Sequence, residues 1–506
     1  MLRATIVILI LNMLSKVLGF IRDAVIVMEF GAGGVTDAYL VAYTLPYALQ
    51  AVLGMSFVTV IVPVLTGYLV RGEEKEGALV ASTVVNGTGI ILTVLTIIGV
   101  LISPWLVKLL APGFGQEQLT LAIRLTKIMF PSIIFMGLGL MLTGILNAHK
   151  IFAVPAFAPS VANIAVILAV LLVGGKYKID GLAIGTLAGF MGFLLIQVPA
   201  IKKLTLGFKK AFDWKHPEVK KLALAVLPVT FAIAVNQINL AMNRYFASLS
   251  LPPGSITALD YANRVMNLPL GIFAAAVATV AFPALAAKGA AKDWQGFGQE
   301  FSASFRLMSF TMLPAGVGLL VLREPVVRLL FERKAFTPEA TLMTSQALLY
   351  FCLGLWFLGA LYLLTRAYYS FGDLKTPAVV GLVAIIANGI FSLIFLNWLG
   401  HRGLALANTL AAGVNGILLF YLLKKRVPQW KPQELLSPLS KMVLAAALMG
   451  AGVNFVHLFW GGFASFWLEA GAVLALALLG VVTYAAAVLL LKVEEGGRIL
   501  KMLRHF

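Results

Sequence analysis

Residues 228–283 decide the fold, and they read PVTFAIAVNQINLAMNRYFASLSLPPGSITALDYANRVMNLPLGIFAAAVATVAFP. The turn Leu251-Pro252-Pro253-Gly254 separates two apolar helices, each long enough to cross a bilayer at roughly 20 residues per crossing. Both helices nevertheless carry polar and ionisable residues: Asn236, Gln237, Asn239, Asn243 and Arg244 in the first, and Asp260, Asn263, Arg264 and Asn267 in the second. An ionisable group at bilayer depth costs roughly 2.5–3.5 kcal/mol, so it usually faces a polar interior. The helix pair therefore predicts one wall of a polar cavity.

The two arginines of this wall differ in their surroundings. Arg264 lies between Asn263 and Asn267 and is followed by Pro269, which distorts a helix, so we predict a functional role for it. Arg244 lies near the end of its helix, where it could also reach the membrane surface or form a structural ion pair.

The composition is that of a polytopic helical membrane protein. Of 506 residues, 60% are hydrophobic and only 12% are charged, and apolar runs of membrane-spanning length recur along the chain. The first run, residues 4–28, has no small-residue cleavage site, so we expect a retained span rather than a signal peptide. The net charge of +18 comes from bases in short loops, which membrane topology explains better than nucleic-acid binding does. A single cysteine, Cys352, excludes intrachain disulfides.

The apolar runs predict fourteen transmembrane helices. They cover residues 4–28, 37–69, 79–103, 120–147, 152–174, 180–201, 219–247, 256–287, 300–322, 340–369, 376–398, 403–423, 440–461 and 466–491. With the N-terminus inside, the inner loops and tail hold 24 Lys and Arg residues against 8 in the outer loops. Both termini are therefore expected in the cytoplasm, although the basic cluster at 323–334 runs against this rule.

An internal repeat relates the first twelve spans. Asp37 and Leu45-Pro46 match Asp260 and Leu268-Pro269 at an offset of 223 residues. The other matching pairs, at offsets of 220 to 225, are Val62-Pro63 with Phe282-Pro283, Pro155 with Pro377, and Ala162-Asn163 with Ala387-Asn388. Each copy holds six spans, an even number, so both copies insert in the same sense. We predict an N-terminal lobe (1–215), a C-terminal lobe (216–430), and a C-terminal helix pair with a cytoplasmic tail (431–506). A polar seam between two such lobes suits alternating access.

The first helix carries the polar wall of the first half. Lys16, Gly19 and Asp23 share one face, with Arg22 beside it, so we expect these charges in the cavity, although an interfacial salt bridge is the alternative for Arg22 and Asp23. Asp37 follows Thr36 at a helix start, where either side chain could also cap backbone amides.

These groups predict an anionic ligand. Lys16, Arg22 and Arg264 form a cationic seam, partly balanced by Asp23, Asp37 and Asp260, and the planar arginine fork suits phosphate oxygens. A lipid-linked pyrophosphate fits, with its head in the cavity and its tail in the bilayer, but the residues alone do not choose it over an anionic drug. We find no phosphate-binding loop, no metal-ligand spacing among the five histidines, and no nucleophile elbow. We therefore expect no catalysis, no cofactor and no metal. The membrane potential or an ion gradient would drive the work.

Several motifs resemble one family. They are Ser15-Lys16-Val17-Leu18-Gly19-Phe20-Ile21-Arg22-Asp23, Phe30-Gly31-Ala32, Thr36-Asp37-Ala38, Ala111-Pro112-Gly113-Phe114, Pro155-Ala156-Phe157-Ala158-Pro159, Val235-Asn236-Gln237-Ile238-Asn239, Tyr261-Ala262-Asn263-Arg264-Val265-Met266, Leu268-Pro269-Leu270-Gly271 and Asp373-Leu374-Lys375-Thr376-Pro377. In this order, over almost the whole chain, they resemble the MurJ (MviN) family of lipid II flippases in the multidrug/oligosaccharidyl-lipid/polysaccharide exporter superfamily. The resemblance implies two six-helix lobes, a C-terminal pair and a hydrophobic groove for a polyprenyl tail. It also implies export of the undecaprenyl-pyrophosphate-linked peptidoglycan precursor, lipid II, across a bacterial plasma membrane, and hence a role in cell-wall synthesis and cell shape.

The resemblance also assigns the site residues, with some departures. Arg22, Asp23, Asp37 and Arg264 fall on central-cavity positions of the family. Lys16 stands where an arginine is usual, Gln50 replaces a cavity arginine, and Asn263 replaces an aspartate. Some members bind sodium through acidic groups on the seventh and eleventh helices. The comparable positions here are neutral, which puts a sodium site in doubt; Asn239, Asn243 and Asn388 are the candidate ion-coupling residues, with Ser392 nearby.

Three other functions compete with this one. Loss of the arginine at Gln50 favours a flippase for another polyprenyl-linked glycan. A cation-coupled multidrug exporter fits an arginine-lined cavity poorly. A non-transporting scaffold that recruits cell-wall synthesis enzymes through the 202–221 loop and the tail would not need Arg264 at bilayer depth.

Overall fold

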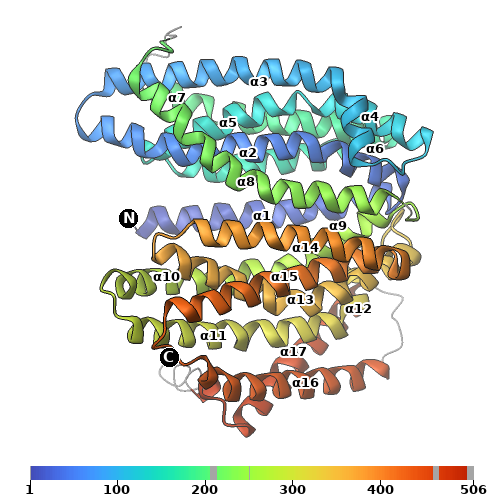
Figure 1. The fold of residues 1–506 in the computed structure, drawn as a ribbon. Helices are drawn as coiled ribbons and strands as arrows, with labels where there is room; N and C mark the ends of the chain where they lie inside the picture. The colour runs from blue at the N-terminus through green and yellow to red at the C-terminus, as the bar shows by residue number, and fades with distance from the viewer. Residues whose placement is uncertain (1, 205–212, 250, 460–465, 498–506) are drawn as a thin grey trace. The chain divides into compact units, whose positions relative to one another are not determined.

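The computed structural model describes residues 2–204, 213–249, 251–459 and 466–497, and the regular elements of these residues are all helices (Figure 1). The first eight are α1 (Leu2–Phe30), α2 (Gly34–Val70), α3 (Glu74–Leu110), α4 (Gln116–Met129), α5 (Ser132–Ala148), α6 (Ala153–Leu195), α7 (Val198–Lys203) and α8 (Pro217–Leu249). The others are α9 (Ser255–Pro269), the π-helical turn η1 (Leu270–Ala274), α10 (Ala275–Ala290), α11 (Trp294–Val321), α12 (Arg323–Phe331), α13 (Pro338–Ser370), α14 (Lys375–Leu399), α15 (His401–Arg426), the 3₁₀ turn η2 (Pro432–Leu435), α16 (Leu436–Leu458) and α17 (Phe466–Leu490). The predicted all-α fold is confirmed.

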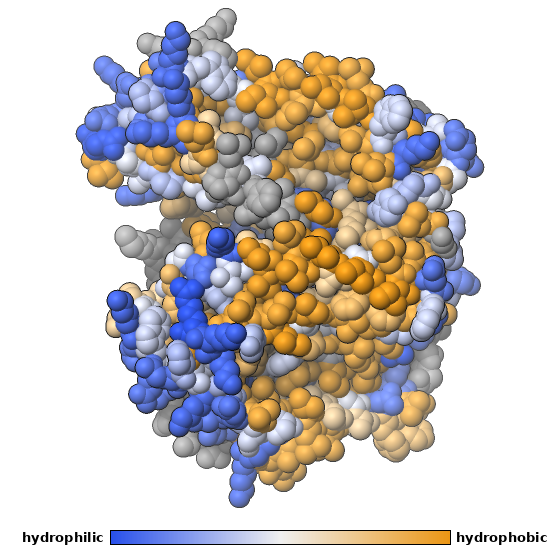
Figure 2. Space-filling view, in the orientation of Figure 1, coloured by the Kyte–Doolittle hydropathy of each residue, from blue (hydrophilic) through white to orange (hydrophobic). Residues whose placement is uncertain are grey.

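The helices have the length and apolarity of membrane spans. Within the described residues, ten helices qualify, or eleven if the bent pair α4 and α5 is one span. The other three helices that a count of fourteen needs are α1, α2 and α8, which hold 29, 37 and 33 residues. At about 1.5 Å per residue each of these three is long enough to cross the roughly 30 Å hydrocarbon core. They are not among the helices that qualify by apolarity in the described part of the chain, and the count of fourteen spans therefore stays a prediction. Figure 2 shows hydrophobic side chains along the sides of the helices and hydrophilic ones gathered near their ends.

Two details of the helices were not predicted. The expected span 120–147 is broken, because α4 ends at Met129 and α5 begins at Ser132 with a bend of 40°. Pro131 lies in the break, where it supplies no backbone N–H and its ring prevents a continuous helix. The second detail is α12, a short amphipathic helix within the basic 323–334 cluster that the hydropathy pattern did not predict. Elsewhere a turn was expected and found, since the backbone of α6 leaves helical geometry at Lys178.

The chain packs as two compact units. The first holds Met1–Ile256 with Arg333–Phe336, and the second holds Thr257–Glu332 with Thr337–Phe506. This division differs from the lobes that the repeat predicts at 215/216, because α8 packs against α2 and α3 of the first unit. The lobes at 1–215 and 216–430 and the C-terminal pair at 431–506 stay a prediction, whereas the two units describe how the chain packs.

Each unit has its own apolar core. In the first, α2 packs on α5 and α3 through buried Ile61, Leu65 and Ile145. In the second, α13 contacts α10, α11 and α15, while α16 and α17 pack together and on α11 through Met449, Leu476 and their neighbours.

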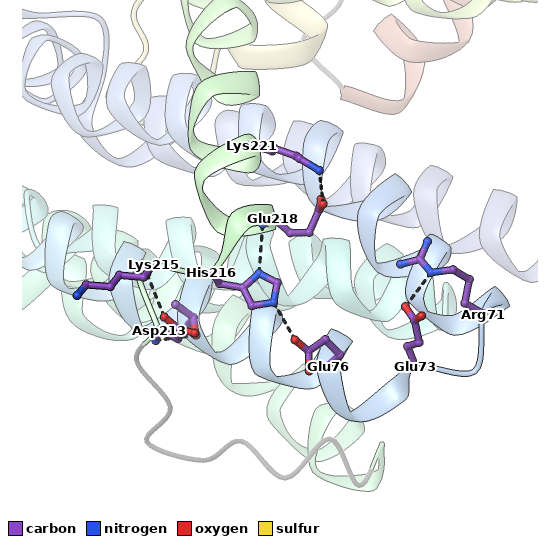
Figure 3. Close-up of polar contacts among 9 residues, drawn as sticks. Arg71, Glu73, Glu76, Asp213, Lys215, His216, Glu218 and Lys221 are labelled. Atoms are coloured by element: carbon purple, nitrogen blue, oxygen red, sulfur yellow. Dashed lines mark hydrogen bonds and ion pairs between the residues drawn. The ribbon is translucent and has the colours of Figure 1, made fainter.

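The start of α8 is tied to α3 by one histidine (Figure 3). The Nδ1 atom of His216 accepts the N–H of Glu218 at 3.2 Å, just past Pro217, which is the first residue of α8. Since Nδ1 accepts, Nε2 carries the ring proton and donates to Glu76 Oε1 at 2.9 Å. His216 therefore caps a helix and pins it to its neighbour, which explains this histidine without a metal.

Candidate functional site

The first polar cluster joins α1 to α6 around Arg22. Its Nε and Nη2 donate to Asp23 Oδ1 at 2.9 and 2.7 Å, and its Nη1 donates to Asn163 Oδ1 at 3.0 Å. Asn163 in turn donates from Nδ2 to the carbonyl of Ser15 at 3.1 Å. The Arg22 side chain keeps 28% of its surface exposed, whereas Asp23 keeps 11%. The cluster is therefore a neutralised but accessible guanidinium, held from two helices.

Lys16 lies on the same helix but differs from Arg22 in burial. The Lys16 side chain is exposed, whereas Arg22 is half-buried, and Lys16 lies two turns before Asp23 along α1. Gly19 lies between them, and a Cβ atom there would lie 3.5 Å from Asn163 Nδ2. The face predicted from the spacing of residues 16, 19 and 23 thus exists, and Asn163 of α6 packs along it.

Asp37 holds a turn. It lies in the first turn of α2 and is 2% exposed, and its Oδ2 accepts the N–H of Gly254 at 2.6 Å. Gly254 has φ +95°, and a Cβ there would collide with the carbonyl oxygen of Ala32. The amides that Asp37 was expected to cap were those of its own helix, but the N–H that it accepts belongs to the turn before α9.

The second polar cluster lies on α9 around Arg264. Asp260 accepts its Nε at 2.8 Å, one turn earlier on the helix, in the favourable order of acid before base. The Arg264 guanidinium lies 5.1 Å from the ring centre of Tyr261, which meets Phe331 of α12 edge to face. Asn263 is half-buried and accepts from Asn267 one turn later. Arg264 is therefore paired and placed over a fixed aromatic ring.

The helix distortion predicted at Pro269 is a π-helical turn. Residues Leu270–Ala274 follow Pro269 directly and lead without a gap into α10. A proline has no N–H to donate, which favours a local change of hydrogen-bond register. The π-helical turn begins six residues after Arg264.

The remaining predicted residues are distributed over both units. Arg244 of α8 is 7% exposed, so it is buried in the first unit and does not reach a surface. Asn239 and Asn243 lie one turn apart on α8 and are half-buried. Asn388 of α14 belongs to the second unit and is buried, as is Ser392 one turn later. Gln50 lies in α2, and its side chain falls outside the described residues.

An apolar cavity of about 610 Å³ opens in the second unit among α11, α16 and α17. Its walls include Phe310, Pro314 and Met449, and its hydroxyl groups belong to Thr311 and Tyr484. Thr311 donates to the Met308 carbonyl at 2.9 Å and Tyr484 to the Phe310 carbonyl at 3.0 Å. Because these hydroxyls are bonded to the backbone, the cavity suits a hydrocarbon.

Asn163 is the site residue that the sequence did not single out. It entered only as one half of the match between Ala162-Asn163 and Ala387-Asn388. A lone amide in an apolar span was a signal that it has a polar partner, but its partner Arg22 is 141 residues away. Finding that partner required the packing of α1 on α6.

Known proteins are similar in sequence to this chain over most of its length. The sequence profile of the family described as "Lipid II flippase MurJ" matches residues 26–487. A "Probable lipid II flippase MurJ" of Vibrio cholerae serotype O1 is 34% identical over 434 residues, which cover 83% of this chain and 82% of the relative. A "Lipid II flippase MurJ" of Burkholderia cenocepacia is 30% identical over 88% of this chain and 89% of its own length.

Solved structures share its fold. A structure described as "Lipid II flippase MurJ, inward closed conformation" superposes with a TM-score of 0.81 at 29% identity, over 95% of this chain and 98% of the other. An inward-facing multidrug resistance MATE family transporter of the MOP superfamily reaches a TM-score of 0.69 at 14% identity, over 84% of this chain and 98% of its own. The second likeness is one of fold alone. The extent of the profile match and of the identities shows that the chain belongs to the MurJ family of lipid II flippases.

Proposed function

We propose that this protein moves undecaprenyl-pyrophosphate-linked peptidoglycan precursor, lipid II, from the inner to the outer leaflet of a bacterial plasma membrane by alternating access. The observation that carries the proposal is the Arg22 cluster. A guanidinium that is held from two helices and still partly exposed can bind phosphate oxygens with its remaining N–H groups. Family membership supplies the substrate class.

Each unit, taken by itself, offers cations that suit a pyrophosphate. Arg22 and Lys16 serve in the first unit, and Arg264 serves in the second with Asn263 beside it. Asp23 and Asp260 orient the two arginines and limit the net charge, so that a polyanion binds without being trapped. Asp37 holds the turn at Gly254 and serves the stability of the first unit rather than the affinity for the substrate.

The polyprenyl tail occupies the apolar cavity among α11, α16 and α17. This cavity offers about 610 Å³ and no unbonded hydroxyl among its described residues. A hydrocarbon chain can fill this cavity at no cost in hydrogen bonds, because the hydroxyl groups of the wall are already bonded to backbone carbonyls. The headgroup and tail thus have separate binding regions.

The setting follows from the same proposal. The protein spans the plasma membrane many times with both termini in the cytoplasm, as the excess of bases on the inner loops favours. It changes no covalent bond, needs no cofactor and does not bind nucleic acid. The membrane potential, or a sodium or proton gradient acting through Asn239, Asn243 and Asn388, drives the cycle. Cell-wall synthesis enzymes are the expected protein contacts.

A second candidate substrate is another polyprenyl-linked glycan. It is favoured by Gln50, which removes a cation from the family's usual set. With a lower affinity for the pyrophosphate, contacts with the sugars would contribute more to the choice of substrate.

Transport by purified protein in liposomes tests the proposal. Fluorescent lipid II and a second undecaprenyl-pyrophosphate glycan are compared for movement between leaflets, with wild type, Arg22→Ala and Arg71→Ala. Arg71 is the matched control, because it is an exposed arginine paired with Glu73 outside the cluster. We expect transport of lipid II by wild type and Arg71→Ala, and a rate at least about 10-fold lower for Arg22→Ala. Preference for the second glycan would establish the alternative, and no movement of either lipid would refute both.

A further inference from the structure

We propose that Asn163 is a positioning residue that aims the Arg22 guanidinium at the pyrophosphate of the substrate. The inference rests on the proposed function and deepens it, since it names what sets the geometry of the anion site. It concerns the first unit alone.

Arg22 has a defined number of donors left for a ligand. A guanidinium carries five N–H groups, and within the described residues three of the bonds recorded for Arg22 go to Asp23 Oδ1, from Nε and Nη2, and to Asn163 Oδ1, from Nη1. One N–H on each Nη therefore remains. Two donors on neighbouring nitrogens match two oxygens of one phosphate group.

Asn163 fixes the direction in which these two donors point. Asp23 is the next residue in α1 and turns with Arg22, so it cannot orient the guanidinium relative to a second helix. Asn163 lies on α6 and is 7% exposed, and its own amide is anchored at 3.1 Å to the Ser15 carbonyl of α1. The Arg22 side chain is thus held against a frame made of two helices, and part of its rotamer entropy is lost before the ligand arrives.

The amide suits this role better than a carboxylate would. It accepts from Arg22 as an acid does, but it brings no charge and leaves the cation available to a polyanion. It also has the N–H that the Ser15 carbonyl accepts, which a carboxylate lacks.

A purely structural role is the competing explanation, and a matched control separates the two. Gln197 is a fully buried amide of the same unit that joins Thr143 at 2.9 Å and the Phe193 carbonyl at 3.0 Å, and none of its recorded contacts involves Arg22. Gln197→Leu should lower the melting temperature and leave ligand affinity unchanged.

The test measures binding of undecaprenyl pyrophosphate to the full-length protein in detergent micelles, together with the melting temperature. The variants are Arg22→Ala, Asn163→Leu, the double variant and Gln197→Leu. If Asn163→Leu does not fold, Asn163→Ser replaces it, because the serine side chain is also too short to reach Arg22. We expect Kd to rise about 10-fold for Asn163→Leu, and the double variant to bind no worse than Arg22→Ala alone, because Asn163 acts through Arg22.

The outcomes separate the inference from the proposed function. Additive losses in the double variant, or unchanged affinity in both Asn163 variants, would overturn the positioning role. If Arg22→Ala itself bound as tightly as wild type, the headgroup site of the proposed function would be wrong. An Asn163 variant that weakens binding only through Arg22 supports both.

Discussion

Ionised residues in the apolar helices are satisfied in different ways. Arg22 and Arg264 each bond a carboxylate on their own helix, one and four residues away. The pair of Arg22 with Asp23 was left open as an alternative by the sequence, and the pair of Arg264 with Asp260 was not predicted. Asp37 and Asn163 find partners 217 and 141 residues away, and only the packing of distant helices could identify them. Local spacing therefore predicted the charges of the site but not the side chains that hold them.

Asp37 provides the first residue-scale prediction. Asp37→Ala removes the acceptor of a buried backbone N–H, which costs about 1–3 kcal/mol when the group stays unsatisfied. We expect a lower melting temperature in detergent and an unchanged affinity for lipid II. Glu73→Ala, at an exposed pair, should change neither quantity. Weaker binding of lipid II at an unchanged melting temperature would instead place Asp37 on the substrate.

At the scale of elements, hydropathy predicted the positions of the helices well. It failed where a helix is broken or short. Pro131 breaks a helix without changing the average hydropathy much, and α12 is only nine residues long and carries three charged side chains. The same limit applies to loops. The Ala111-Pro112-Gly113-Phe114 motif reads as a turn, and its packing on the end of α8 becomes visible only in the structure.

Gly113 provides the element-scale prediction for packing. A Cβ at Gly113 would collide with backbone atoms of Ser248 and Leu249, which cannot rotate away, whereas a Cβ at Gly115 would meet nothing within 4 Å. We expect Gly113→Ala to lower the melting temperature and the yield of folded protein, and Gly115→Ala to match wild type. Equal stability of the two variants would show that the contact between this turn and α8 is dispensable.

The start of α11 provides a prediction for pH. The Asp293 carboxylate accepts hydrogen bonds from Lys288 Nζ at 2.8 Å and from the N–H of Gly296 at 2.9 Å. The bond from Lys288 is the main cause, and the bond from Gly296 the second, of a carboxyl pKa below the ordinary value of 3.8. A lowered pKa means that the stabilisation is complete above the ordinary value and is lost as the pH falls through the lowered one. Hydrogen exchange at the first turn of α11 should therefore be faster in Asp293→Ala than in wild type at pH 7. The difference should shrink as the pH falls below 3.8 and vanish once the pH is below the lowered pKa of the carboxyl. A difference that did not shrink with falling pH would exclude the carboxylate as the cause.

At the scale of the whole molecule, the repeat predicted two related halves, but packing divides the chain elsewhere. No pattern in residues 217–249 says that α8 packs on α2 and α3, since an apolar helix can bury its surface against many neighbours. A segment of the later half, Arg333–Phe336, also packs within the first unit. Its Ala335 N–H donates to the Met28 carbonyl at 3.0 Å, and Lys334 pairs with Glu29 at 3.2 Å.

This segment provides a prediction about transport. The Arg333–Phe336 segment packs within the first unit but connects α12 to α13 of the second. Alternating access is expected to move this segment relative to α1, so a covalent bond between them should stop transport. In a Cys352→Ala background, cross-linking Glu29→Cys to Lys334→Cys is expected to abolish lipid II transport in liposomes, with recovery after the link is cleaved. The control joins Arg124→Cys to Asp180→Cys, an ion pair at 3.0 Å between α4 and α6 of one unit, and should leave transport intact. Full transport by the first cross-linked protein would show that this contact persists through the cycle.

The most direct test of the central claim is growth of a bacterium depleted of its own lipid II flippase. Wild type, Arg22→Ala and Arg264→Ala are expressed at matched levels in the membrane. We predict that wild type restores growth and that both variants fail, because each removes a cation to which we assign binding of the pyrophosphate. Failure of wild type itself, at normal membrane levels, would contradict the lipid II assignment and favour another polyprenyl glycan. Rescue by all three proteins would contradict the cationic site.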